Sequence, residues 1–431
     1  MKAVDADSVR IREIVEKCLQ AALPVGKGLP KEDEDWLESD TVDSMGHVEV
    51  LLCIESAMGL PNLFAQVGDA PPTTTRSAIE IVQKALPGEA KSATEKGRKH
   101  LSQERSTGGS AGIVGWAAAL GSERVTSDKI EEAFNLSKGT LANRAGIDSV
   151  SLASSDENEV LLAKVAANRA LQMAGVSAQS PNWIIGTSET FLAFPSFAAS
   201  LHTALLASST CQVLDIGGAC VGLLNCFAVA AALLADPYVD CILIASADVH
   251  SRILAQGKVP GEFAGLFGDG ASAFVLRRPV EEKDAAPYLI RASIGSCSGT
   301  FSSVLQVRLA ANASIALELD GEALARAAVD RMERIINDLE RTSGVTRDAV
   351  SAFALHQPNP RLVETLLRRA RLPADKVPLV AKVSGNLGSS TCGVALSMAL
   401  DVHAKKPRSE RGPIMIASVG PGMLWAGTIL N

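Results

Sequence analysis

The sequence has few aromatic residues, no excess of basic residues and no long apolar run, and these absences exclude several classes of protein. Only 4% of the 431 residues are aromatic, and the formal net charge is -7. Such a chain lacks the basic footprint of most nucleic-acid-binding proteins. The longest apolar run, Val221 to Ala235, is too short to span a bilayer and contains Asn225. The charged, amphipathic start is unlike a secretory signal. We therefore expect a cytoplasmic protein with neither a nucleic-acid nor a membrane partner.

The cysteines also lack the spacing of a metal or redox motif. None of the eight forms a CxxC pair, which argues against zinc and thioredoxin-type sites and favours a protein without a metal. They are scattered through apolar stretches, which suits reduced thiols better than a disulfide framework. They are Cys18, Cys53, Cys211, Cys220, Cys226, Cys241, Cys297 and Cys392.

The net negative charge of the chain lies near its start. Residues 1–86 hold 15 acidic and 8 basic side chains, so the remainder of the chain is neutral overall. Such a run is either a solvated acidic face or a small module that docks on basic surfaces. Residues 87–109 are rich in Gly, Ser, Lys, Glu and Arg, which predicts a flexible linker. A chain of this length predicts two or three domains, the first ending near residue 86.

After the linker, short β-prone runs alternate with longer stretches rich in Ala and Leu. This alternation indicates an α/β fold with a mostly parallel sheet covered by helices. The predicted strands are 183–186, 212–216, 240–245, 351–356 and 413–419, and the predicted helices are 158–174, 221–235, 321–342 and 394–404.

The first domain has the pattern of a small helical bundle. Apolar residues recur at helical spacing early in the chain, and a second helix opens at Asp43-Ser44-Met45 and stops at Gly59. Capping is the ordinary role of Asp and Ser at such a start. The triplet and its acidic helix also resemble the acyl carrier protein family, over residues 5–86. The resemblance implies a four-helix carrier domain with 4′-phosphopantetheine on Ser44, added by a phosphopantetheinyl transferase. Met45 stands where the family usually has Leu.

Cys220 is the cysteine best placed for chemistry. It follows a β-like run and two glycines, directly before an Ala-rich helix, and a helix start stabilises a thiolate and lowers its pKa. The alternative is a small buried core residue, as expected for the other seven. Among the six histidines, His356 ends an apolar run where the chain turns, which favours catalysis at a sheet edge. His47, His100, His202, His250 and His403 have no surroundings that suggest chemistry.

Several separate motifs resemble the β-ketoacyl-acyl carrier protein synthase III family. They are Ala219-Cys-Val-Gly222, His356-Gln-Pro-Asn-Pro-Arg361, Gly385-Asn386, Phe267-Gly-Asp-Gly-Ala271, Ala193-Phe-Pro-Ser196 and Gly420-Pro-Gly422 followed by Trp425. The resemblance covers residues 110–431. It implies a thiolase-like αβαβα five-layered core of two similar halves, 110–280 and 281–431, in a homodimer.

The resemblance also implies roles for particular residues. Cys220 would hold the acyl group, while His356 and Asn386 would stabilise the enolate formed when a malonyl-type thioester loses CO2. From the residues alone, Asn386 is equally a turn residue or cap. Phe194 would shape the acyl pocket, Arg144 and Arg361 would bind substrate near the tunnel mouth, and Gly422 would belong to the oxyanion loop.

Two departures from the family pattern bear on the substrate and the oxyanion hole. Pro421 has no N–H to donate if it occupies the donor position of the glycine loop. Thr140 stands where the family has a Trp that stacks on coenzyme A. Together with the fused carrier, this loss favours acyl groups bound to the chain's own or a separate carrier protein.

Three functions remain open at this point. The leading hypothesis is a ketosynthase III-like condensing enzyme that joins an acyl group to a malonyl-type thioester. An acyltransferase would instead pass the acyl group from Cys220 to an alcohol or amine, with His356 as base. A non-catalytic scaffold is the third class, although such proteins commonly lack the cysteine.

Overall fold

A computed structural model of the chain describes residues 6–24, 26–60, 63–66, 71–86, 111–254, 259–278, 288–309 and 315–431. The chain divides into two compact units. The first comprises residues 1–101 with 320–330, and the second comprises 102–319 with 331–431. The predicted linker, 87–109, and the predicted boundary between the two halves near 280 lie outside the described residues.

The first unit is helical in its described part. Its helices are α1 (Ala6–Ala22), α2 (Ser44–Met58), α3 (Leu63–Gln66) and α4 (Thr75–Ala85). Helix α2 begins where the sequence predicts, because the Asp43 side chain accepts the backbone N–H of Gly46 at 2.7 Å. It ends at Gly59, whose φ of 66° is left-handed. Apolar side chains from α1, α2 and α4 form one core, which includes Val15, Leu51 and Val82.

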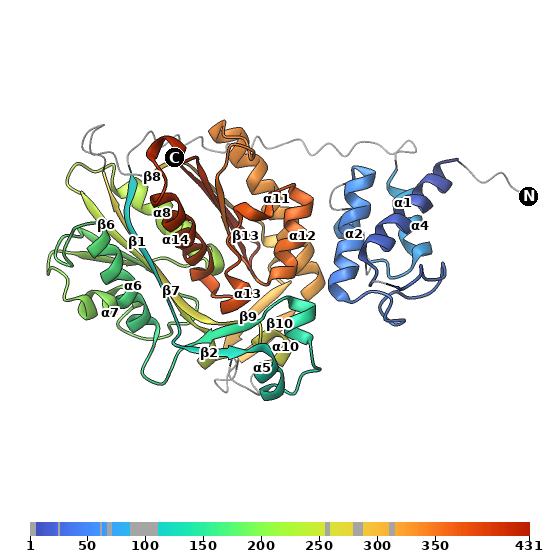
Figure 1. Cartoon of the computed structure of the whole chain (residues 1–431), viewed down its shortest axis with the longest axis horizontal. Coiled ribbons are helices and arrows are strands. Elements are labelled where there is room, and N and C mark those ends of the chain that lie inside the picture. Colours follow the sequence, from blue (N-terminus) through green and yellow to red (C-terminus); the bar gives the residue numbers. More distant parts are fainter. Residues whose placement is uncertain are drawn as a thin grey trace, which may run out of the picture. The chain divides into compact units, whose positions relative to one another are not determined.

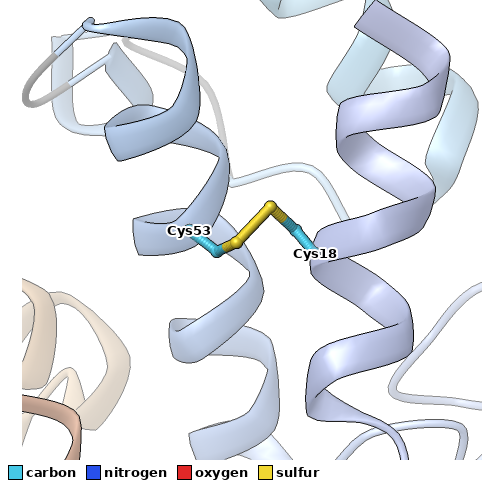
Figure 2. The surroundings of a disulfide bond; sticks show 2 residues. All are labelled: Cys18 and Cys53. Carbon is cyan, nitrogen blue, oxygen red and sulfur yellow. A yellow bond between two sulfur atoms is a disulfide. The ribbon is translucent and has the colours of Figure 1, made fainter. Parts of the chain in front are cut away.

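Two cysteines of this unit form a disulfide, so the expectation that all eight cysteines are thiols is wrong. Cys18 of α1 and Cys53 of α2 are bonded, with their Cα atoms 5.6 Å apart (Figure 2). This separation lies within the usual range for a disulfide. The residues are 35 positions apart in the chain, and only the packing of α1 on α2 brings them together. The remaining six cysteines are free.

The second unit is built on one sheet whose strand order is β11-β12-β13-β8-β1-β7-β6-β4-β5. Its first half contributes β1 (Gly112–Leu120), β4 (Trp183–Thr187), β5 (Gln212–Asp215), β6 (Cys241–Val249) and β7 (Asp269–Arg277). Its second half contributes β8 (Tyr288–Cys297), β11 (Ala352–Leu355), β12 (Ile414–Gly420) and β13 (Leu424–Leu430). The halves join where Gly112 and Ile113 pair with Leu289 and Tyr288. Smaller ribbons pair β2 (Glu123–Thr126) with β3 (Ser149–Leu152) and β9 (Leu305–Leu309) with β10 (Ile315–Leu319).

The sheet is mixed, which corrects the prediction of a mostly parallel one. Strand β4 pairs in parallel with β5 and β6, and β11 with β12. The central strands β1, β7, β8 and β13 pair antiparallel. Strand β1 was not predicted because its residues are rich in Ala and Gly, a composition that resembles a helical segment. Its Gly115 is needed, since a Cβ there would lie 2.1 Å from the carbonyl oxygen of Ala170 in α6.

Helices cover the two halves of the sheet in layers (Figure 1). Helices α6 (Glu159–Met173) and α7 (Phe197–Leu205) pack on the outer face of the first half. Helices α8 (Gly222–Leu233) and α14 (Thr391–Ala404) contact strands of both halves and form the middle layer. On the outer face of the second half, Ile335 and Leu339 of α11 (Gly321–Ser343) pack over Gly427 of β13. This arrangement agrees with the expected αβαβα layering.

The remaining elements are short, apart from α12, and several of them carry site residues. They are α5 (Ser127–Ala133), α9 (His250–Ile253), α10 (Gly261–Ala264), α12 (Pro360–Ala370), α13 (Ala381–Ser384), η1 (Thr140–Ala145), η2 (Ala219–Val221), η3 (Gly299–Phe301), η4 (Ala374–Lys376), η5 (Gly388–Ser390) and η6 (Arg408–Glu410). None of the helices in the described part of the chain is both long enough and apolar enough to cross a membrane.

Candidate active site

Cys220 lies on a tight turn between β5 and α8, as the sequence predicts. Gly218 has a φ of 139°, and Ala219 has a φ of 47°, which a residue with a Cβ adopts only under backbone strain. A Cβ on Gly218 would lie 2.5 Å from the Asn225 side-chain nitrogen. The turn therefore depends on glycine and sets Cys220 directly before the twelve-residue helix α8.

The charge state of this thiol differs from the sequence prediction. Burial raises the pKa of the Cys220 thiol well above its ordinary value, and the nearby carboxylates of Glu189 and Asp248 raise it further. The helix start alone predicted a depressed pKa of Cys220, and that prediction is wrong because burial and two nearby carboxylates raise the pKa instead. The resting thiol is consequently protonated at neutral pH.

His356 lies in the segment that follows β11, and its side chain is buried. Its backbone N–H donates to the carbonyl oxygen of Ala417 in β12 at 2.9 Å. Burial lowers the pKa of the His356 imidazole to about 4, so the ring is neutral at physiological pH. A neutral imidazole keeps one N–H and can donate a hydrogen bond to a carbonyl oxygen.

Asn386 is buried, and both its backbone and its side chain are fixed. Its backbone N–H donates to Leu266 at 2.8 Å, and its carbonyl accepts from Gly268 at 3.0 Å. Its Oδ1 accepts from the Gly388 N–H at 3.0 Å and from the Thr391 hydroxyl at 3.2 Å. Because two donors occupy the oxygen end of the carboxamide, the amide end is the part that can donate to a ligand.

Strand β12 holds the first two of these residues together. The carbonyl oxygen of Cys220 accepts the Ser418 hydroxyl at 2.7 Å, and the preceding residue, Ala417, accepts the His356 N–H. The turn η2 of Cys220 also packs against η5, which begins two residues after Asn386. The structure thus brings Cys220, His356 and Asn386 to one place from three separate parts of the chain.

Three further ionisable residues in this place were missed by sequence reasoning. Glu189 follows β4, and its carboxylate affects the pKa of the Cys220 thiol and of the His356 imidazole. His250 follows β6, and its Nε2 lies 3.6 Å from the Glu189 carboxylate, so the sequence-based dismissal of this histidine is wrong. Asp248 is fully buried at the end of β6. All three lie at the carboxyl ends of neighbouring parallel strands, a signal that the sequence did contain.

The peripheral residues predicted to bind substrate fall into two groups. The turn η1, which carries Arg144, packs against α12, which carries Arg361, so these two basic residues lie on contacting elements. Gly422, with a φ of 132°, lies in the turn after β12, where a Cβ on Gly420 would lie 3.4 Å from the Cys220 backbone nitrogen. Phe194 is fully exposed, so it shapes no pocket within its own chain.

Ser44 is the first residue of α2, in the first unit. Across the described residues, no group of three or more His, Cys, Asp or Glu side chains could hold a metal ion.

Comparisons with known proteins agree with this fold. A family model described as 3-Oxoacyl-[acyl-carrier-protein (ACP)] synthase III matches residues 214–295, and the model of its C-terminal part matches residues 340–431. The β-ketoacyl-[acyl-carrier-protein] synthase III of Granulibacter bethesdensis is 27% identical over 323 residues, which cover 74% of this chain and 98% of the relative. That of Neisseria meningitidis is 27% identical over 328 residues, covering 74% and 99%.

Solved structures share the fold at lower identity. The 3-oxoacyl-[acyl-carrier-protein] synthase III of Aquifex aeolicus VF5 aligns with a TM-score of 0.66 and 24% identity, over 74% of this chain and 99% of that one. OleA of Xanthomonas campestris aligns with a TM-score of 0.66 and 19% identity, over 74% and 98%. The fold is thiolase-like, and the relatives to which the chain is similar are condensing enzymes. Both matched models describe the 3-oxoacyl-[acyl-carrier-protein] synthase III family, to which residues 214–295 and 340–431 of this chain are similar.

Proposed function

We propose that the chain catalyses a decarboxylative Claisen condensation through an acyl-enzyme on Cys220. The sulfur attacks an acyl thioester and releases its thiol. A malonyl-type thioester then loses CO2, and the resulting enolate attacks the acyl carbon, which forms a carbon–carbon bond and frees the Cys220 thiolate. The product is a β-ketoacyl thioester.

The orientation of Asn386 supports this proposal most directly. Its carboxamide oxygen is occupied by Gly388 and Thr391, so its amide end can donate to the enolate oxygen. His356, neutral and buried, can supply a second donor. Donors fixed in advance toward developing negative charge contribute about 2.7–4 kcal/mol each to transition-state stabilisation. An acyl transfer to an alcohol or amine forms no enolate, so these two donors would have no enolate oxygen to stabilise.

The first unit is proposed to be a carrier domain. Ser44 is the first residue of a fifteen-residue helix. The side chain of its N-cap residue, Asp43, accepts the backbone N–H of Gly46. The free N–H groups and the dipole of such a helix start favour a phosphodiester, so the residues present fit 4′-phosphopantetheine on Ser44. The group would supply a thiol that carries the acyl chain as a thioester. Tethering raises the effective concentration to roughly millimolar, so only weak docking is needed.

A second copy of the chain is proposed to complete the acyl pocket. Phe194 is fully exposed, and the neighbouring strand β5 forms an edge of the sheet with Val213 exposed. An apolar side chain of this size can line a pocket only when another surface covers it, and a homodimer joined along this edge would provide that surface.

The central experiment follows both steps of the proposed condensation. The protein is incubated with acetyl-, butyryl-, hexanoyl- and lauroyl-coenzyme A, then with malonyl-carrier protein, and Cys220 loading and β-keto products are measured by mass spectrometry. We expect loading, CO2 release and a β-keto product. Loading of Cys220 with no CO2 release would reject condensation.

The carrier domain is tested separately. We expect a phosphopantetheinyl transferase and coenzyme A to add one phosphopantetheine to the protein and none to Ser44→Ala. Ser77→Ala serves as a control for a serine in another helix of the same unit. An unmodified wild-type protein would remove the carrier proposal and leave the condensation untouched.

A further inference from the structure

Glu189 occupies a position beside the nucleophile that the proposed condensation does not explain. The turn of Cys220 packs against the segment that carries Glu189, because a Cβ on Gly222 would lie 2.1 Å from the Thr187 hydroxyl. The Glu189 carboxylate and the Cys220 thiol affect each other's pKa, and the other ionisable neighbours of Glu189 are His250, Asp248 and His356. Its Oε1 is buried, with no hydrogen-bond partner among the described residues. Its side chain still keeps 19% of its surface exposed. A carboxylate with one free oxygen beside a sulfur can exchange a proton with it.

Asp248 fixes the position of Glu189 through a hydrogen bond from the Glu189 backbone. The backbone N–H of Glu189 donates to Asp248 Oδ1 at 2.6 Å, and the Ser188 hydroxyl donates to the same oxygen at 3.3 Å. Asp248 Oδ2 accepts from the backbone and the hydroxyl of Ser389 at 2.9 and 2.6 Å. These bonds fix the segment of Glu189 against the segment that follows Asn386.

His250 supports the carboxylate from its other side. Its ring centroid lies 4.5 Å from that of Phe267, and its Nε2 lies 3.6 Å from Glu189 Oε2. A Cβ on residue 388 would lie 2.5 Å from the ring carbon Cε1, so Gly388 is what gives the ring its space. Although burial opposes it, the Glu189 carboxylate and the carboxylates of Asp248 and Asp269 raise the pKa of His250, which favours an imidazolium.

Although burial opposes it, hydrogen bonding to His250 lowers the pKa of Glu189, so the side chain is a carboxylate at neutral pH and can accept a proton. If the thiol lost its proton to solvent, two anions would face each other in a buried place. If His356 took the proton, a cation would be created where burial disfavours one. A transfer from Cys220 to Glu189 leaves one negative charge in the site before and after, and His250 can balance it.

We propose that Glu189 is the catalytic base and acid of the first half-reaction, a role that rests on the proposed function. Its carboxylate accepts the Sγ proton of Cys220 as the sulfur attacks the thioester carbonyl and forms the new carbon–sulfur bond. When the carbon–sulfur bond of the donor thioester breaks, the carboxylic acid returns that proton to the leaving thiolate. The carboxylate is regenerated, and no electron donor or acceptor is involved.

The test compares Glu189→Gln with wild type in two reactions of the same sulfur. The first is acylation of Cys220 by whichever of the four acyl-coenzyme A probes loads wild type, followed by rapid quench and intact-mass analysis. The second is alkylation of Cys220 by iodoacetamide at pH 7, located by peptide mass spectrometry. Glu132→Gln, an exposed position on α5, is the matched control.

The two rates are expected to change in opposite directions. Acylation of Glu189→Gln falls by about 100-fold or more, because general acid–base assistance is lost. Alkylation rises by roughly 10-fold, because iodoacetamide needs only the thiolate and the neighbouring anion that opposes it has been removed. A change that merely disturbed the fold would not accelerate one reaction and slow the other. Glu132→Gln leaves both rates within about twofold.

Two results would overturn the role of Glu189. One is acylation of Glu189→Gln at the wild-type rate, whether or not the later condensation is lost. The other is a parallel fall of both acylation and alkylation, which would indicate a structural role. A wild-type protein that no acyl thioester loads would instead overturn the proposed function itself, so the two failures are distinguishable.

Discussion

Asp248 and Ser389 are joined by two hydrogen bonds, one from the Ser389 backbone N–H at 2.9 Å and one from its hydroxyl at 2.6 Å, both to Asp248 Oδ2. The other carboxylate oxygen accepts the backbone N–H of Glu189 at 2.6 Å. One fully buried side chain therefore ties the segment after β4 to the segment after Asn386. The geometry of the site depends on this carboxylate even though it is not the nucleophile.

Asp248→Asn should destabilise the protein. The amide can accept on one side only, so its NH2 end would face a backbone or hydroxyl donor and leave it unsatisfied, at a cost of about 1–3 kcal/mol. Urea unfolding followed by tryptophan fluorescence measures the loss. Asp128→Asn, exposed on α5, is the control and should change little. Equal stability of the two variants would contradict the structural role of Asp248.

Asn386→Ala should separate the two half-reactions. It removes one donor to the enolate, so condensation should fall by about 100- to 1000-fold, while acylation of Cys220 proceeds at nearly its normal rate. Quenched-flow measurement of Cys220 loading and of CO2 release reports the two steps independently. Full catalytic activity of this variant would favour acyl transfer to an alcohol or amine instead.

Acidification should weaken the fold through His356. Its pKa is about 4 in the folded protein, below the 6.5 of an unperturbed histidine, so between these values the unfolded chain binds a proton that the folded chain does not. The contribution of His356 to the free energy of unfolding should therefore fall by up to about 3 kcal/mol as the pH drops across this window, and stay constant above it.

The comparison with His356→Gln isolates this contribution. His250 acts in the opposite sense, because its raised pKa adds stability at low pH that is lost as the pH rises through its folded pKa. Urea unfolding of both proteins at several pH values gives the difference. If wild type and His356→Gln lose stability in parallel between pH 6.5 and 4, the shift of His356 is not the cause.

Reduction should lower the stability of the first unit. The Cys18–Cys53 bond closes a loop of 35 positions, for which chain entropy predicts a stabilisation of about 3–4 kcal/mol. Thermal unfolding with and without dithiothreitol measures it, and Cys18→Ala/Cys53→Ala should no longer respond to the reductant. Titration of the denatured, unreduced protein should find six thiols, and finding eight would refute the bond.

Exposure of Phe194 makes self-association testable. Phe194→Glu places a charge on a fully exposed side chain, so it should leave the monomer fold intact but shift sedimentation toward the monomer if a second copy covers this site. Tyr238→Glu, another exposed aromatic, is the control. Unchanged sedimentation of Phe194→Glu would argue against an interface there.

Much of the fold could be predicted because the pattern of apolar residues within a segment indicates its secondary structure. The strand predicted at 183–186 and the helix predicted at 221–235 are present as β4 and α8, and Asp43 was predicted from the chemistry of helix caps. The central strand β1 was missed, since its Ala-rich sequence reflects close packing by α6 rather than β-propensity.

The candidate site was predictable only in part. Cys220 and His356 follow strands and stand beside recognisable turns. Glu189 and His250 also follow strands, but their chemistry comes from each other, across 61 positions of sequence that no local pattern connects. The pKa of Cys220 was mispredicted for the same reason, because the burial and the two carboxylates that raise it come from packing with distant parts of the chain.

Ala417 and Ser418 are neighbours on β12, and each fixes the backbone of one partner in the reaction. A displacement of β12 would move the backbones of Cys220 and His356 together, so the distance between their side chains would change little when the sheet fluctuates. In the proposed condensation, substitutions in the surrounding loops can then change which acyl chains fit while the spacing of sulfur and imidazole is kept.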